Sequence, residues 1–263
     1  MLFNIVLINA IFLSCTKSEP VEPTLNTEIE LGCVTGSLLT DRIAFYPFNN
    51  GSLSDYSVNG LNLLNSSSAH ATADRFGNAD CAFEFLNNST TTEFLECTVT
   101  TAYNNLNEFS ISLWYEPIDI TRNGNDFEVL ISRGEGQSCP DRFGDWSVAL
   151  YDCRKAVFGR EGSVWDIDLI AQTCQDQIVL RTGSWHHLVA IYNSGSMSIY
   201  RDGLLQSTST GPAGCNPAIV MQDLGNLFLG KSYTGKLDDI IIYSRSLTSG
   251  EISALYQAPS CCQ

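Results

Sequence analysis

One tryptophan stands among residue types that suit sugar recognition. Trp165 follows a turn and precedes Asp166, and Arg142 and Asp145 lie upstream. Aromatic faces stack on sugar rings, while nearby charged and amide groups bind the hydroxyls. We therefore interpret these four residues as a candidate glycan site. The alternative is that Trp165 is an edge-strand residue that packs on a neighbouring loop.

Three acidic residues suggest a second site, because Asp55 follows the first expected strand and Asp238 and Asp239 begin the last one. Both faces of that last strand are apolar, so at least one carboxylate points inward, where an unpaired charge is costly. A structural calcium ion, which takes six to eight oxygen ligands, is the predicted partner. Loop amides, Arg42 or Lys236 are the alternatives.

The adjacent His186 and His187 invite a metal-site interpretation. Consecutive residues of a strand point to opposite faces, so one ion cannot bind both. The remaining histidine, His70, is isolated in the sequence, and a zinc site is therefore disfavoured. We expect structural roles for both neighbours.

The first residues of the chain predict an export signal. Residues 2–13 are almost entirely apolar, which is too short for a bilayer span and right for a signal peptide. The run ends in Phe12-Leu13-Ser14-Cys15, which resembles the lipobox of bacterial lipoproteins, where the cysteine is acylated. We predict a signal peptide over 1–15, a linker over 16–40, a folded domain over 41–258 and a cysteine-containing tail over 259–263. Membrane contact would come only from a lipid on Cys15; an ordinary cleaved signal and a secreted protein are the alternative.

Ten cysteines in an exported chain predict disulfides rather than zinc ligation. If Cys15 carries lipid, nine remain, so at least one stays free or pairs between molecules. Residues that face each other across a hairpin are equally far from its turn, which predicts two pairs. These pairs are Cys81 with Cys97 and Cys153 with Cys174, and elimination then leaves Cys33 with Cys261 or Cys262, and Cys139 with Cys215.

The elements that must position these residues are strands. Apolar residues alternate with others over 109–116 and 146–151, which is typical of strands with unequal faces. Asp202-Gly203 lies between two further strand-like runs and predicts a hairpin turn, since both residues tolerate positive φ. Thr248 and Glu251 form a capping box, which predicts one short helix.

Composition supports one β domain and excludes some partners. Hydrophobic residues make up 44% of the chain and charged residues only 16%, which suits a sizeable core. The net charge of -15 would repel nucleic acid. We predict an all-β fold, a two-sheet antiparallel jelly-roll sandwich with one short C-terminal helix.

Four stretches stand in order along the chain: 42–48 with Asp55, 109–114, 185–190 with 199–203, and 235–243 with 247–256. Together they resemble the laminin G-like domains of the concanavalin A-like lectin/glucanase superfamily. The resemblance implies a sandwich that recognises a glycan or an extracellular protein, often with structural calcium, on a bacterial surface lipoprotein. Glucanases of the superfamily carry a Glu-x-Asp-x-x-Glu motif, which this chain lacks, so we expect binding without catalysis. A polysaccharide-active enzyme and a structural component of a surface complex are the alternatives.

Overall fold

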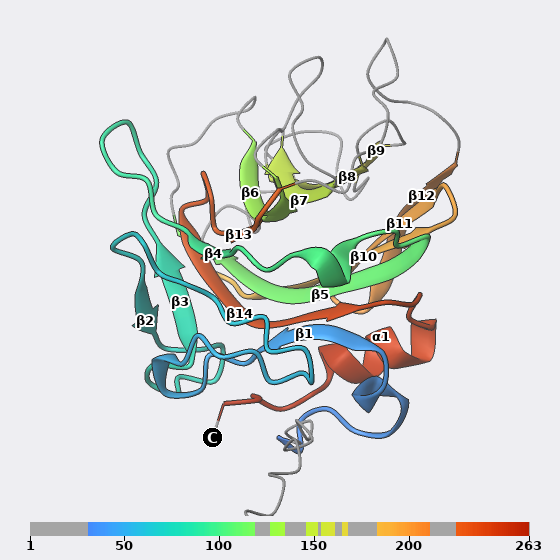
Figure 1. Ribbon diagram of the computed structural model, residues 1–263, viewed down its shortest axis with the longest axis horizontal. Helices are drawn as coiled ribbons and strands as arrows, with labels where there is room; N and C mark the ends of the chain where they lie inside the picture. Colours follow the sequence, from blue (N-terminus) through green and yellow to red (C-terminus); the bar gives the residue numbers. More distant parts are fainter. Residues whose placement is uncertain are drawn as a thin grey trace, which may run out of the picture.

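Two antiparallel sheets lie face to face in the computed structural model (Figure 1), which describes residues 31–118, 127–134, 146–151, 154–160, 165–167, 183–210 and 225–262. The larger one, sheet A, has the spatial order β12 (Leu204–Thr210), β11 (Ser196–Arg201), β10 (His186–Asn193), β5 (Glu108–Pro117), β14 (Gly235–Tyr243), β3 (Ala82–Phe85) and β2 (His70–Thr72), with β1 (Arg42–Tyr46) also paired to β14. Sheet B has the order β4 (Leu95–Cys97), β13 (Leu227–Leu229), β6 (Glu128–Arg133), β7 (Trp146–Tyr151), β8 (Lys155–Arg160) and β9 (Trp165–Ile167). This is the predicted all-β sandwich.

β14 organises sheet A. One of its edges pairs with β5, and the other pairs first with β3 and then with β1. The register against β5 shifts between Asp238 and Ile241, and Asp239 has a φ of 42°. An extra residue at a left-handed φ is a β-bulge, which locally re-aims the side chains of its strand.

The alternation predicted for β5 is confirmed. Phe109, Ile111, Leu113 and Tyr115 belong to the core between the two sheets. We call this side the inner face of sheet A. The intervening Ser110, Ser112, Trp114 and Glu116 occupy the outer face, and all four are buried as well.

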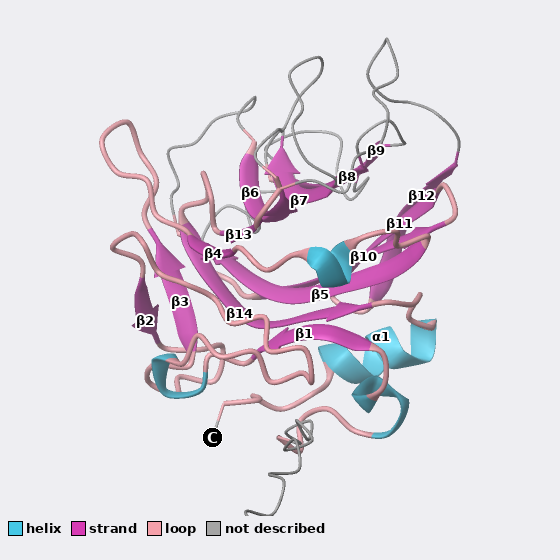
Figure 2. Ribbon diagram, viewed as in Figure 1, coloured by secondary structure: helices cyan, strands magenta, loops and turns pink. Residues whose placement is uncertain are grey.

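The predicted hairpin and helix are also confirmed. Asp202 and Gly203 both have positive φ and join β11 to β12, with Arg201 opposite Leu204. The helix α1 (Ser249–Tyr256) is capped by Thr248, whose side chain forms the reciprocal capping box with Glu251. In Figure 2, α1 lies on the side of sheet A that faces away from sheet B.

A second core covers the outer face of sheet A. It combines Phe45, Val189, Ile241 and Tyr243 from the strands with residues of α1 and of both ends of the described chain. These ends are the segment around η1 (Gly36–Leu39) and the residues after α1. Two further short 3-10 turns, η2 (Asn49–Gly51) and η3 (Thr101–Tyr103), lie in loops. Within the described part of the chain, no helix is long and apolar enough to cross a membrane.

Candidate functional site

The bulge in β14 places two carboxylates against one guanidinium. Asp238 and Asp239 are consecutive, yet both accept a hydrogen bond from Nη1 of Arg75, at 2.6 and 2.7 Å. All three side chains are buried. Because consecutive residues of a regular strand would point to opposite faces, the bulge is what allows this shared contact.

Burial controls the protonation of these acids. Burial raises the pKa of Asp238 well above its usual range, and the neighbouring Asp239 adds to the effect. Burial also raises the pKa of Asp239 to about 6, although Arg75 opposes the shift. Removal from water disfavours the charged form, and a nearby opposite charge favours it. Both carboxyl groups therefore hold a proton more readily than exposed acids do, and Arg75 opposes this tendency.

The three predicted calcium ligands do not meet. Asp55 accepts hydrogen bonds from the backbone N–H groups of Phe45, Ser57 and Leu61, so its carboxylate joins its own loop to β1. The described residues contain no group of three His, Cys, Asp or Glu side chains that could hold a metal. Arg75 supplies the charge that the sequence analysis assigned to calcium. Calcium binding itself stays a prediction.

Sequence reasoning missed Arg75, because it comes from the loop between β2 and β3, 163 positions before Asp238. The loop is held by Asp74, which accepts hydrogen bonds from the backbone N–H groups of Phe76 and Asn78. Asp74 also accepts a hydrogen bond from the hydroxyl of Ser260. The local sequence signal for an ordered loop at this position was Asp74, whose carboxylate closes its own turn.

His187 lies beside this ion pair on the outer face. Its Nε2 is 2.9 Å from the hydroxyl of Ser112, and its ring packs on Trp114 with centroids 5.1 Å apart. His186 points the other way, to Tyr115 and Asp202. The expectation that the two histidines face opposite sides is confirmed. We call Arg75, Ser112, Trp114, His187, Asp238 and Asp239 the outer-face cluster.

Ser112 and His187 resemble part of a catalytic triad, but their environment does not support that chemistry. Burial, followed by the charge of Arg75, lowers the pKa of His187 to about 3, so the imidazole is a poor base at neutral pH. His187 lines a cavity together with Asp239, Leu255 and other residues. This cavity measures ≈ 10 Å³, which is room for about one water molecule. A substrate would not fit this cavity.

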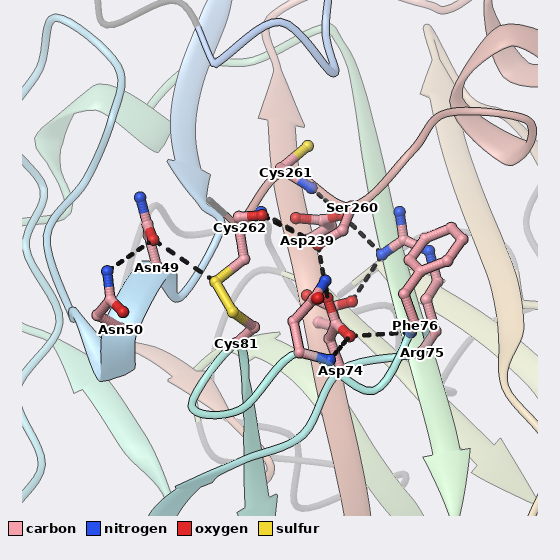
Figure 3. The surroundings of a disulfide bond; sticks show 12 residues. Asn49, Asn50, Asp74, Arg75, Phe76, Cys81, Asp239, Ser260, Cys261 and Cys262 are labelled. Carbon is pink, nitrogen blue, oxygen red and sulfur yellow. Dashed lines mark hydrogen bonds and ion pairs between the residues drawn. A yellow bond between two sulfur atoms is a disulfide. The ribbon is translucent and has the colours of Figure 1, made fainter.

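Two disulfides fasten the C-terminal tail over the outer-face cluster. Cys33 pairs with Cys261 and Cys81 pairs with Cys262, and Figure 3 shows the second bond beside the loop that carries Arg75. The N–H of Cys261 donates to Asp239. The expectation that Cys33 pairs with a terminal cysteine is confirmed.

The predicted pairing of Cys81 with Cys97 is wrong. Hairpin symmetry assumes that β3 and β4 pair, but β3 belongs to sheet A and β4 to sheet B. The turn between them therefore crosses from one sheet to the other. Cys97 keeps a buried thiol that donates to the carbonyl of Val99. Cys15, Cys139, Cys153, Cys174 and Cys215 lie outside the described residues.

The candidate glycan site around Trp165 is only partly described. The backbone of Trp165 and Asp166 forms part of β9, opposite Gly159 and Phe158 of β8. Arg142 and Asp145 lie outside the described ranges. The glycan site on these residues stays a prediction.

Comparison with known families decides the classification. A laminin G-type family model, described as the concanavalin A-like lectin/glucanases superfamily, matches residues 91–253, which is more than half of the chain. The chain belongs to this superfamily. Its concanavalin A-like domain also includes the strands before residue 91, because β1, β2 and β3 complete sheet A. No curated protein is significantly similar to it in sequence.

Solved structures share the same fold. The binding domain of botulinum neurotoxin DC, in complex with rat synaptotagmin II, aligns with a TM-score of 0.60 and 15% identity, covering 83% of this chain and 51% of that one. The binding domain of Paraclostridial Mosquitocidal Protein 1 aligns with a TM-score of 0.63 and 16% identity, covering 83% and 52%. The concanavalin A-like chain thus spans about half the length of these structures, and at such identities the likeness concerns the fold.

Proposed function

We propose that this chain is an exported binding protein that recognises a glycan or an extracellular protein and catalyses no reaction. The superfamily includes both lectins and glucanases, so the state of the carboxylates separates binding from catalysis. One observation carries the proposal: every buried carboxylate of the described residues already accepts a hydrogen bond from a protein group. Retaining hydrolysis needs two carboxyl groups about 5–5.5 Å apart that are free to act on the sugar. The acids and their donors are Asp55 with Ser57, Asp74 with Ser260, Glu93 with Ser68, Glu116 with Lys236, Glu128 with Arg154, and Asp238 and Asp239 with Arg75.

Similar structures support a binding role by analogy. One is described as botulinum neurotoxin type C, whose cell entry depends on interaction with two ganglioside molecules; it aligns at 14% identity with a TM-score of 0.59. Those ligands belong to the toxins. Fold likeness alone does not transfer a ligand, so it supports the class of function and no particular partner.

The place of action in this proposal is the cell surface. Disulfides persist in oxidising compartments, and two of them close the described domain. The lipobox-like Cys15 supplies the proposed anchor, as an outer-membrane or other surface lipoprotein. Replacing Cys15 with Ser should abolish palmitate labelling and release the protein from membranes. Unchanged membrane association would contradict the anchor and leave the binding proposal standing.

Screening the purified domain against a glycan array and a polysaccharide panel tests the binding role. We expect reproducible binding to a defined group of glycans and no release of sugar from any polysaccharide. Steady turnover of a polysaccharide would overturn the proposal in favour of an enzyme. Absence of glycan binding would restrict it to a protein ligand, which immobilised extracellular proteins would then test.

A further inference from the structure

Two exposed aromatic side chains flank the outer-face cluster. Phe76 is 60% exposed and Tyr256 is 39% exposed, which is unusual for large aromatic side chains in an otherwise well-packed domain. Phe76 lies in the loop between β2 and β3, and Tyr256 ends α1. Both are connected to the same support, although they are 180 positions apart in sequence.

Ring contacts join these side chains into one row. The guanidinium carbon of Arg75 lies 4.9 Å from the ring centroid of Phe76 and 4.5 Å from that of Trp114. Trp114 in turn stacks on Tyr256, with centroids 5.8 Å apart and planes 18° apart. We call Phe76, Arg75, Trp114 and Tyr256 the aromatic row. Its middle is buried and its two ends face solvent.

The row is rigid before any ligand arrives. Arg75 donates to two carboxylates and to the carbonyls of Ala258 and Pro259, so it cannot rotate away. Asp74 fixes the backbone of Phe76, as Figure 3 shows beside the second disulfide. Aromatic side chains that are already ordered lose little conformational entropy on binding.

Gly203 adds a steric requirement at the other end of the row. A Cβ at this position would lie 3.1 Å from Cδ1 of Tyr256, and Gly203 has a φ of +79°. The hairpin turn thus packs closely on one side of Tyr256. Trp114 stacks on the same ring, so the exposed part of Tyr256 is what these two contacts leave uncovered.

The only positive charge of the row is already paired with acids. Its only cation, Arg75, already faces two acids, and the chain as a whole has a charge of -15. An acidic ligand such as a sialylated or sulfated sugar would meet repulsion without a compensating free cation. An uncharged ligand with an apolar face would meet the exposed parts of two ordered rings.

We propose that the aromatic row binds an uncharged glycan, with sugar rings packed against the exposed parts of Phe76 and Tyr256. The proposal rests on the glycan-binding role proposed above and adds to it a site and a ligand class. The site is on the outer face of sheet A, away from the strand that carries Trp165. Stacking of a sugar ring on an aromatic face supplies affinity, and polar groups at the rim supply selectivity.

The test compares three purified proteins on the same set of uncharged and sialylated oligosaccharides, followed by calorimetric titration of the best binder. They are the wild type, the double variant Phe76→Ala/Tyr256→Ala, and Leu64→Ala. Leu64 is a matched control, because it is 52% exposed and bridges to Glu96 of sheet B. We expect the wild type and Leu64→Ala to bind the same uncharged glycan, and the double variant to bind it about tenfold or more weakly.

Each other outcome has a distinct meaning. Equal glycan binding by the double variant would overturn the aromatic row as the site while the binding function stands. Binding of sialylated glycans alone, or of no glycan, would overturn the ligand class. Sedimentation that shows a wild-type dimer and a monomeric double variant would assign the row to a second copy of this chain. Melting curves of the variants establish that both remain folded.

Discussion

Nη1 of Arg75 lies 2.6 Å from Oδ2 of Asp238, although the two residues are 163 positions apart in the sequence. Their contact closes the loop between β2 and β3 onto the central strand of sheet A. Asp239 joins the same guanidinium through the bulge. The relationship explains how a strand with two apolar faces can contain two consecutive acids.

Replacing Arg75 with Met should destabilise the domain by about 3–5 kcal/mol at pH 7, because a buried ion pair that loses one partner leaves an uncompensated charge. Urea unfolding with the disulfides intact measures this change. Adding Asp239→Asn to the variant should restore part of the loss, since it removes one of the stranded acids. A loss below about 1 kcal/mol would contradict the structural role of the pair.

Two buried groups should give opposite pH trends. Below pH 6.5 the unfolded state protonates His187 while the folded state, with a pKa of about 3, does not, so this contribution to stability falls as pH drops. Asp239 has a folded pKa of about 6, above its unfolded value of 3.8, so its contribution is complete below pH 3.8 and is lost as pH rises through 6. Between pH 6 and 4 the two groups change the free energy of unfolding in opposite directions, each by up to about 1.4 kcal/mol per pH unit.

Single variants separate these slopes. The destabilisation caused by His187→Gln should be smaller at pH 4.5 than at pH 7, whereas that caused by Asp239→Asn should be larger at pH 4.5. The other charged groups at this site, Asp74, Arg75 and Asp238, are unchanged in both variants. Unfolding free energies at the two pH values measure the trends, and the same sign in both variants would refute the assignment.

The disulfide arrangement predicts an unusual digestion product. Because Cys261 and Cys262 are adjacent, both bonds should leave one complex of three peptides, containing Cys33, Cys81 and the tail. Non-reducing mass spectrometry detects this complex. Cys97 should react with an alkylating agent only after unfolding, since it is buried. A peptide that links Cys81 to Cys97 would restore the pairing that the structure replaces.

Calcium should add little stability through Asp238 and Asp239, because Arg75 already neutralises the pair through one oxygen of each carboxylate. We expect equal melting temperatures in chelator and in millimolar calcium. An ion that binds the native state alone would raise the melting temperature. A rise of several degrees that disappears in Asp239→Ala would show that calcium competes successfully with Arg75.

The parts of the fold that could be predicted depend on neighbours in sequence. The alternation of β5, the Asp202-Gly203 turn and the capping box of Thr248 and Glu251 each follow from spacings of a few residues, and all are confirmed. These signals arise from local geometry, so no knowledge of the distant chain is needed.

The site was harder to predict, because its contacts are distant in sequence. The position of Asp238 in an apolar strand predicts a buried charge, but it does not indicate which cationic residue neutralises that charge. The bulge at Asp239 cannot be recognised from the sequence pattern of the strand. The predicted pairing of Cys81 with Cys97 failed for a related reason. Its strand continues into a turn that changes sheets, and symmetry about a turn is informative only when both flanking strands pair with each other.

The adjacency of Cys261 and Cys262 has a mechanical consequence. A force that pulls the two ends of the described chain apart enters at Cys33 and crosses one covalent bond to Cys261, 228 positions later. Tension therefore bypasses both sheets and the helix, and the strands between these cysteines carry no load. Under stretching from its ends, the domain should extend only slightly until a sulfur–sulfur bond breaks.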